Sequence, residues 1–290
     1  MTTVNSLYSR MIKAMGIDNL EIPFTAVKIY RGNDVISDLV RQYEPDDISV
    51  TSCQANKQAS IGDVLLLTRD NIGCIAAAIT FGLVDDKQDY ALKGSRVYTD
   101  IMKEQSELDE RFAPPTPKDF TDGLVYACRD ADKPEYCLFG DKDSGRFKSV
   151  EIAAKAVSEM IAIKPADTKG VFFYSKDFDD DDVIPDVVTM DVRPVELTRI
   201  VQAYQFMTGE RVIGNMGPVR VVNSDLIVRP YLTGEINFSS YCVGARLIAK
   251  YDPNRLGIGI PFKKFKLLVQ GMEESMHGYP FYNYPGAKSN

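Results

Sequence analysis

The chain has 290 residues, of which 44% are hydrophobic and 26% charged, ordinary values for a soluble globular protein with a sizeable core. A formal net charge of −7 and a pI of about 5.0 argue against binding to nucleic acid or to anionic membrane surfaces. Five cysteines, an odd number at irregular spacing, argue against a secreted disulfide framework.

The first predicted element is an amphipathic helix within residues 1–16. Its apolar residues recur at helical spacing: Val4, Leu7, Tyr8, Met11, Ile12 and Met15. Arg10 and Lys13 interrupt the segment, which is unlike the apolar core of a signal peptide. No run in the sequence approaches the roughly 20 apolar residues of a membrane-spanning helix. We therefore expect a cytoplasmic protein that is not associated with a membrane.

Two predicted strands follow, Phe24–Tyr30 and Val64–Thr68, both rich in β-branched, aromatic or aliphatic residues. The segment 85–140 differs, because it is dense in Lys, Asp and Glu and thin in apolar residues. It contains Cys128 and Cys137, which are expected to be structural or redox bystanders. We interpret 85–140 as an excursion from the main domain.

Strands and helices alternate again in the rest of the chain. The predicted strands are Val171–Tyr174, Val187–Val192, Val219–Val222 and Leu256–Ile260. The predicted helices run from Ser149 through Met160, from Pro194 to just before Gly209, and onward from Pro261 with Phe265, Leu268, Val269 and Met272 as a buried stripe.

This order predicts an α/β or mixed α+β fold, a layered sheet with amphipathic helices in a single domain over residues 1–290. A weak internal duplication is a minority alternative, since strands, a helix and a cysteine-bearing segment occur in both halves. The tail 278–290 has too many prolines for regular structure. Its aromatic residues are expected to cover a surface, either on this subunit or on a neighbouring copy in a homo-oligomer.

Three cysteines, Cys53, Cys74 and Cys242, each follow a small or polar residue and begin a stretch that can become helical. The positive end of a helix dipole and its unpaired N–H groups favour a thiolate. A thiolate binds metal or attacks an electrophile, so these residues are candidates for cofactor chemistry. The alternative is that they are small buried thiols, since cysteine is among the most buried residue types.

The spacing of the cysteines excludes the Cys-x2-Cys pattern of zinc knuckles and bacterial ferredoxins. The single histidine, His277, leaves a His-rich metal site almost without ligands. Three thiolates with one open position instead suit an iron–sulfur cluster, and soft ligands also accept copper(I) or zinc.

Several sequence motifs occur in one order along residues 20–85 and 140–275. They are Pro23–Lys28, Ser52–Ala55, Gly73-Cys74, Ala76–Ala78, Gly82-Leu83, Pro185–Val188, Gln202-Ala203, Thr208–Val212, Pro230–Gly234, Tyr241–Arg246 and Gly257–Pro261. In these motifs the chain resembles the domain-of-unknown-function 169 family, the uncharacterised ArCR group. The resemblance implies that the three cysteines and Pro230–Gly234 belong to one shared site. Relatives often carry a further cysteine in the segment matching 222–225, where this chain has Asn223.

Polar residues near these motifs are candidates for ligand binding. Arg229 and Arg246 could each hold a carboxylate or phosphate bidentately, with Asn223 beside them, or they could form surface ion pairs. The acidic run Asp177–Asp182 is interpreted as a solvated turn. Gly257–Pro261 lacks the third glycine of a dinucleotide fingerprint and is interpreted as a strand entering a helix.

We therefore expect a protein that gathers Cys53, Cys74 and Cys242 around an iron–sulfur cluster or another thiophilic metal. Its role would be redox chemistry or the binding of a small anionic substrate. Neither role requires the protein to be an enzyme. The alternative is a cofactor-free small-molecule binding protein with structural thiols. A cysteine nucleophile is a weaker third option, because no base is evident.

Overall fold

The computed structural model describes residues 3–47, 50–84, 159, 161–178, 180–217 and 220–275. At its centre is a six-stranded sheet with the order β2-β3-β1-β4-β6-β5, in which all neighbouring strands are antiparallel. The strands are β1 (Phe24–Arg31), β2 (Leu65–Leu67), β3 (Thr168–Tyr174), β4 (Val187–Val192), β5 (Asn237–Ser239) and β6 (Leu256–Pro261). The antiparallel pairing makes the fold mixed α+β, one of the two predicted alternatives.

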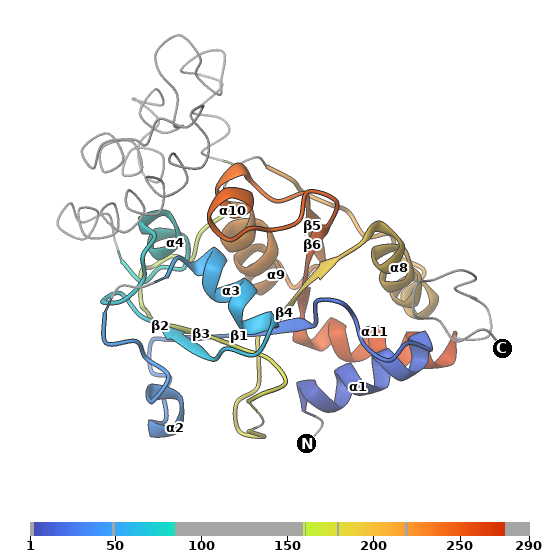
Figure 1. Cartoon of the computed structure of the whole chain (residues 1–290), viewed down its shortest axis with the longest axis horizontal. Coiled ribbons are helices and arrows are strands. Elements are labelled where there is room, and N and C mark those ends of the chain that lie inside the picture. The colour runs from blue at the N-terminus through green and yellow to red at the C-terminus, as the bar shows by residue number, and fades with distance from the viewer. Residues whose placement is uncertain are drawn as a thin grey trace, which may run out of the picture.

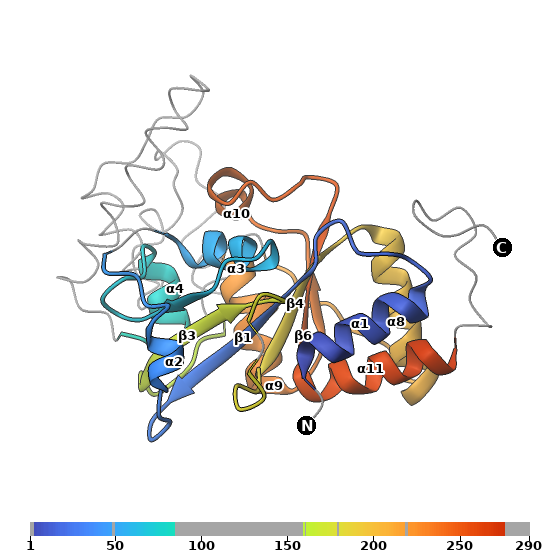
Figure 2. The same cartoon turned by 60° about the horizontal axis from the view of Figure 1, so that its bottom comes forward.

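Helices cover both faces of this sheet. They are α1 (Val4–Met15), α2 (Asp38–Arg41), α3 (Ser52–Ser60), α4 (Ile75–Thr80), α8 (Pro194–Thr208), the π-helix η2 (Val221–Val228), α9 (Arg229–Thr233), α10 (Val243–Ile248) and α11 (Phe262–Glu274). Helices α3, α4 and α10 gather on one side of the sheet, and α1, α8 and α11 on the other (Figure 1 and Figure 2).

Alternating side chains along each strand build a separate core on each face. In β1, Val27 and Ile29 pack into the cluster beneath α3, α4, α10 and η2, while Phe24, Ala26 and Tyr30 pack beneath α1 and α11. This period of two is the signature of a strand buried on both faces. The sheet therefore separates two cores that share no side chains.

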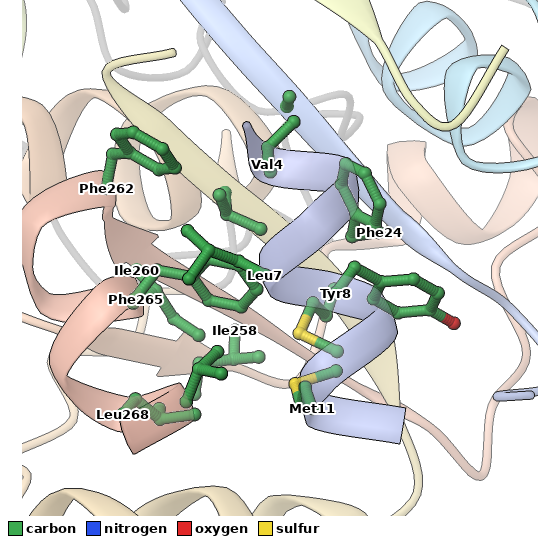
Figure 3. Close-up of a cluster of buried hydrophobic side chains, with 14 of the residues drawn as sticks. Val4, Leu7, Tyr8, Met11, Phe24, Ile258, Ile260, Phe262, Phe265 and Leu268 are labelled. Carbon is green, nitrogen blue, oxygen red and sulfur yellow. The ribbon is translucent and has the colours of Figure 1, made fainter. Parts of the chain in front are cut away.

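The core on the α1 side explains the helices that were predicted best. Figure 3 shows side chains from α1, β6 and α11, among them Leu7, Ile258 and Phe265, meeting in one cluster. The six residues buried by α1 are the six of the predicted stripe. Thr3 caps the start of α1 by accepting a hydrogen bond from the Ser6 N–H at 3.1 Å, which satisfies one of the first-turn donors.

The boundaries of α8 and α11 are also as predicted. Pro194 is the first residue of α8, and Gly209 ends it in the left-handed conformation with φ 70°. Helix α11 follows Pro261 directly, so Gly257–Pro261 is a strand entering a helix. The absence of a side chain at Gly271 lets α11 lie against the Ala203 carbonyl of α8, because a Cβ there would overlap it.

On the opposite face, two glycines of β6 let η2 lie directly on the sheet. A Cβ at Gly259 would overlap the Leu226 backbone, and a Cβ at Gly257 would overlap the Leu226 side chain. All eight residues of η2 are buried. In the Gly-Ile-Gly-Ile sequence of β6, the isoleucines therefore face one core. The glycines leave room for η2 on the other face.

Two predictions in this part of the chain were wrong. Val221 and Val222, the last two residues of the predicted strand 219–222, instead begin η2, because a short, fully buried apolar run has no period that distinguishes helix from strand. The three-residue strand β5 was missed, since its Asn-Phe-Ser sequence carries little strand signal. The acidic run is a turn whose Asp177, Asp181 and Asp182 are exposed, as interpreted.

Several predictions lie outside the described residues: the helix from Ser149 through Met160, the excursion 85–140 with Cys128 and Cys137, and the tail 278–290. The single domain and the internal duplication stay predictions. Among the helices that are described, none combines the length and apolar character needed to cross a bilayer.

We predict that Gly259→Ala lowers the free energy of unfolding by about 3 kcal/mol, because the new methyl group would push the Leu226 backbone out of a close-packed core. Gly217→Ala is the matched control, since the nearest atom to its Cβ would be 4.0 Å away. It should change stability by less than about 1 kcal/mol. Urea denaturation measures both, and equal midpoints for the two variants would contradict the packing described for η2.

Candidate functional site

The three predicted cysteines all lie at the first turn of a helix. Cys53 is the second residue of α3, Cys74 is the N-cap of α4, and Cys242 is the N-cap of α10. The Cys242 Sγ accepts a hydrogen bond from the Ala245 N–H at 3.4 Å, so the sulfur itself caps its helix. The sequence prediction that each cysteine begins a helix is confirmed.

The start of α3 is fixed by a capping box. The Gln54 N–H donates to Thr51 Oγ1 at 3.3 Å, and the Thr51 N–H donates to Gln54 Oε1 at 2.9 Å. Two first-turn donors are thereby satisfied reciprocally. This arrangement fixes the orientation of the first turn and leaves Cys53 facing the core beside η2 and α10.

The structure places the three cysteines on one face of the sheet, with Cys242 and Cys74 near Cys53. Helix α3 contacts both α10 and η2, and α4 contacts η2. The thiols of Cys242 and Cys74 both influence the ionisation of Cys53, in addition to the effect of burial. Within the described ranges, however, no three His, Cys, Asp or Glu side chains form a group that could hold a metal ion.

Burial raises the pKa of Cys53 well above its usual range, and the neighbouring thiols of Cys242 and Cys74 raise it further. The hydrogen bond with Ser52 acts in the opposite direction without offsetting them. Although Cys53 as a residue keeps partial exposure, its thiol is densely surrounded by protein atoms. The expectation that the helix N-terminus favours a thiolate is therefore wrong for Cys53, which is a neutral thiol near pH 7.

Asn223 lies close to Cys53 through its contact with Ser52. It is 3% exposed, and its side-chain oxygen accepts a hydrogen bond from the Ser52 hydroxyl at 2.5 Å. Because Ser52 precedes Cys53, this bond ties η2 to the start of α3. Insertions of π-helix are frequent at functional sites, and η2 carries Asn223 to the cysteines.

A buried polar layer that sequence reasoning missed lies beneath α3. The Tyr251 hydroxyl accepts from Asn56 Nδ2 at 3.0 Å and donates to the Cys53 carbonyl at 3.3 Å. Thr189 donates to Asn56 Oδ1 at 2.8 Å, and the Tyr251 ring stacks on Tyr241 with centroids 4.1 Å apart. The alternation of Thr189 and Asp191 with apolar residues in β4 was the signal that could have shown a polar face.

Asp191 continues this layer, at 5% exposure. Its Oδ1 lies 3.5 Å from Arg255 Nε, and the Tyr241 hydroxyl lies nearby. In the part of the chain that is described, neither carboxylate oxygen has a partner in good hydrogen-bonding geometry. Burial raises the pKa of Asp191 to about 6, although Arg255 and Tyr241 oppose the shift.

The two predicted ligand-binding arginines lie in different places. Arg246 donates to the backbone carbonyls of Ser240 and Asp252, the latter at 2.8 Å, and so braces the loops on both sides of α10. Arg229 lines a cavity of about 340 Å³. Arg246, Asn223 and the three cysteines do not line this cavity. The prediction that these residues bind a ligand stays a prediction.

Fold and site together define a mixed α+β protein with three cysteines at helix N-termini beside a buried π-helix. A family model described as uncharacterised ArCR, domain of unknown function 169, matches residues 19–271. The chain belongs to this family, and the resemblance seen in its motifs is confirmed. Neither the curated proteins nor the solved structures contain a match to the chain.

We predict that replacing Asp191 changes how stability depends on pH. Because its folded-state pKa of about 6 exceeds the roughly 3.9 of an unfolded aspartate, its protonated form stabilises the fold, and this contribution is lost as pH rises through 6. Asp191→Asn is neutral throughout. Its unfolding free energy relative to wild type should rise by about 2 kcal/mol between about pH 4.5 and pH 7.5.

Chemical denaturation at several pH values measures this difference. Asp70→Asn is the control, since the Asp70 side chain is exposed and its stability curve should run parallel to wild type. Parallel curves for Asp191→Asn as well would contradict the raised pKa.

Proposed function

We propose that Cys53, Cys74 and Cys242 hold an iron–sulfur cluster or another thiophilic metal centre. One observation supports the proposal: three cysteines from widely separated segments begin three helices on one face of the sheet, with Cys74 and Cys242 near Cys53. Packing alone does not require cysteine at three helix starts, where Ser, Thr, Asp and Asn are preferred. Soft thiolate donors select iron–sulfur, copper(I) or zinc over oxygen-loving metals.

The described side chains contain no group of three donors close enough to hold a metal ion as they stand. A structural zinc ion needs four ligands at about 2.1–2.3 Å, and a cluster likewise binds each thiolate directly to iron. Binding of either centre would therefore have to draw the three thiols closer together.

The residues around the thiols fit this role in two ways. The Ala245 N–H already donates to the Cys242 sulfur, and charge on a bound cluster would be stabilised by such helix N-terminal donors. The raised pKa of Cys53 means that metal binding must release its proton, so assembly should be favoured by higher pH. A bound cluster would supply one-electron transfer or a Lewis-acidic iron.

Asn223 would occupy the edge of this centre. The resemblance implies that its amide replaces a cysteine that relatives often carry in this segment. The Ser52 hydroxyl, on the residue before Cys53, donates to the Asn223 side chain at 2.5 Å. Three thiolates and an amide would leave one metal position without a thiolate. A small anionic substrate is the class of ligand that such an open position would accept.

A cofactor-free binding protein is the second candidate. Cys53 and Cys74 pack against the apolar cluster that contains Cys242, and a neutral Cys53 thiol is stable in those surroundings. The same neutral thiol disfavours a metal-free cysteine nucleophile, which needs a lowered pKa. The two remaining candidates differ in whether the purified protein takes up iron and sulfide.

We predict that the chain, reconstituted anaerobically with iron and sulfide, retains both in near-stoichiometric amounts. Replacing any one of Cys53, Cys74 or Cys242 by alanine should weaken retention by about 100-fold or more, since loss of even an outer-shell partner costs 10- to 100-fold. Iron and sulfide analysis with electron paramagnetic resonance measures this. Cys128→Ala and Cys137→Ala are the matched controls and should retain the wild-type content. Colourless protein with a full thiol titre after reconstitution would overturn the proposal and support the cofactor-free candidate.

A gain-of-ligand variant makes a separate prediction. Asn223→Cys places a fourth thiol next to Cys53, so the cluster should resist removal by a chelator about 10-fold longer than in wild type. Asn223→Ser, which keeps a hydroxyl partner for Ser52, is the control. Equal rates of loss for the two variants would show that position 223 does not face the metal centre.

A further inference from the structure

A cavity of about 340 Å³ lies where α8, the segment 209–217, α9 and β5 meet. We call it the α8–α9 cavity, and the residues that matter to its chemistry are Tyr204, Arg211, Val212, Arg229 and Ile236. Its volume lies in the usual range for small-molecule sites. None of the three cysteines lines it.

Two arginines line the α8–α9 cavity. Arg229 is the first residue of α9, and Arg211 follows the end of α8. Arg229 donates one hydrogen bond, from Nη2 to the Glu159 carbonyl at 3.4 Å, and its buried Nε has no hydrogen-bond partner among the described residues. Arg211 forms no ion pair with any part of the chain that is described.

The acidic groups at and near the cavity each have a partner. Glu235, which lines the cavity, pairs with Lys264, and Glu210 accepts a hydrogen bond from the Tyr204 hydroxyl at 2.6 Å. Asp225 lies near Arg229 but does not line the cavity, and its carboxylate accepts from the Gly217 N–H at 3.2 Å. Among the lining residues, the two arginines outnumber the one acidic residue, in a chain whose net charge is −7.

The rest of the wall is largely apolar. Val212 and Ile236 contribute aliphatic surface, and both pack against the core on the α1 side of the sheet. Apolar walls with a few placed polar groups are typical of sites for organic molecules. Two arginines beside such walls suit a ligand with an anionic head and an apolar body, because a guanidinium binds carboxylate or phosphate through two parallel hydrogen bonds.

We propose that the α8–α9 cavity binds a small organic anion. Its carboxylate or phosphate group is held by Arg211 and Arg229, and its apolar part lies on Val212 and Ile236. The proposal is independent of the metal centre, because the two sites share no lining residue.

Isothermal titration calorimetry on the full chain tests the proposal with four probes: hexanoate, hexyl phosphate, hexanol and inorganic phosphate. We expect one or both of the hexyl anions to bind, more tightly than hexanol, which lacks the charge, and than inorganic phosphate, which lacks the apolar body. The affinities of hexanoate and hexyl phosphate are then compared. Tighter binding of hexanoate indicates recognition of a carboxylate, and tighter binding of hexyl phosphate indicates recognition of a phosphate.

Variants assign the binding to the arginines. Arg211→Gln and Arg229→Gln should each weaken the tighter hexyl anion by about 10-fold or more, the usual effect of losing a hydrogen bond to a charged group. Arg229→Lys keeps the charge but loses the forked geometry, so its effect should be intermediate. Arg69→Gln removes an exposed arginine that does not line the cavity and should leave binding unchanged.

Two further measurements keep the test decisive. Arg211 is exposed, so Arg211→Gln should retain the wild-type unfolding midpoint, and its loss of binding cannot then be due to misfolding. In Cys53→Ala, the part of the binding that depends on Arg211 should be the same as in wild type, because Cys53 does not line the cavity. Failure of both hexyl anions to bind at millimolar concentration, hexanol binding as tightly as they do, or unchanged binding in Arg211→Gln would each overturn the proposal.

Discussion

The contact between η2 and β6 is the packing constraint on which the candidate site depends. Leu226 lies so close to both glycines that a Cβ at Gly259 would overlap its backbone and a Cβ at Gly257 would overlap its side chain. A polar backbone can be buried this deeply only when its own groups are paired, and a helix pairs them internally. The two glycines therefore set how closely η2 approaches the sheet. The same distance fixes where the side chains of η2 lie.

Two sites follow from this placement. At one point η2 presents Asn223 to Ser52, beside Cys53 and the polar layer of Asn56 and Tyr251. At its end η2 continues directly into α9, whose first residue is Arg229 in the α8–α9 cavity. One continuous helical segment thus supplies a residue to the thiol group and a residue to the arginine-lined cavity, although no side chain lines both.

The parts of the fold that could be predicted are those with local signals. Helix α1 has an unbroken stripe, α8 has Pro194 and Gly209 at its ends, and β4 has the predicted bounds. The position of η2 could not be predicted, because a buried apolar run has no distinguishing period. The cysteines could be chosen from their local sequence, but not the pKa of Cys53, which is set by packing from distant segments. Tyr251 and Asn56 were missed for the same reason, since they meet only through the fold.

Because η2 is helical, the number of residues in it determines whether Asn223 and Arg229 can both reach their sites. A helix of either kind turns by roughly a quarter of a circle per residue, so an insertion or deletion between Asn223 and Arg229 that kept the winding would rotate everything that follows by about that angle. Asn223 could then stay beside Ser52 only if Arg229 left the cavity, or the reverse. A substitution within this segment changes one side chain, whereas such an insertion or deletion would separate the two sites that the helix now serves together.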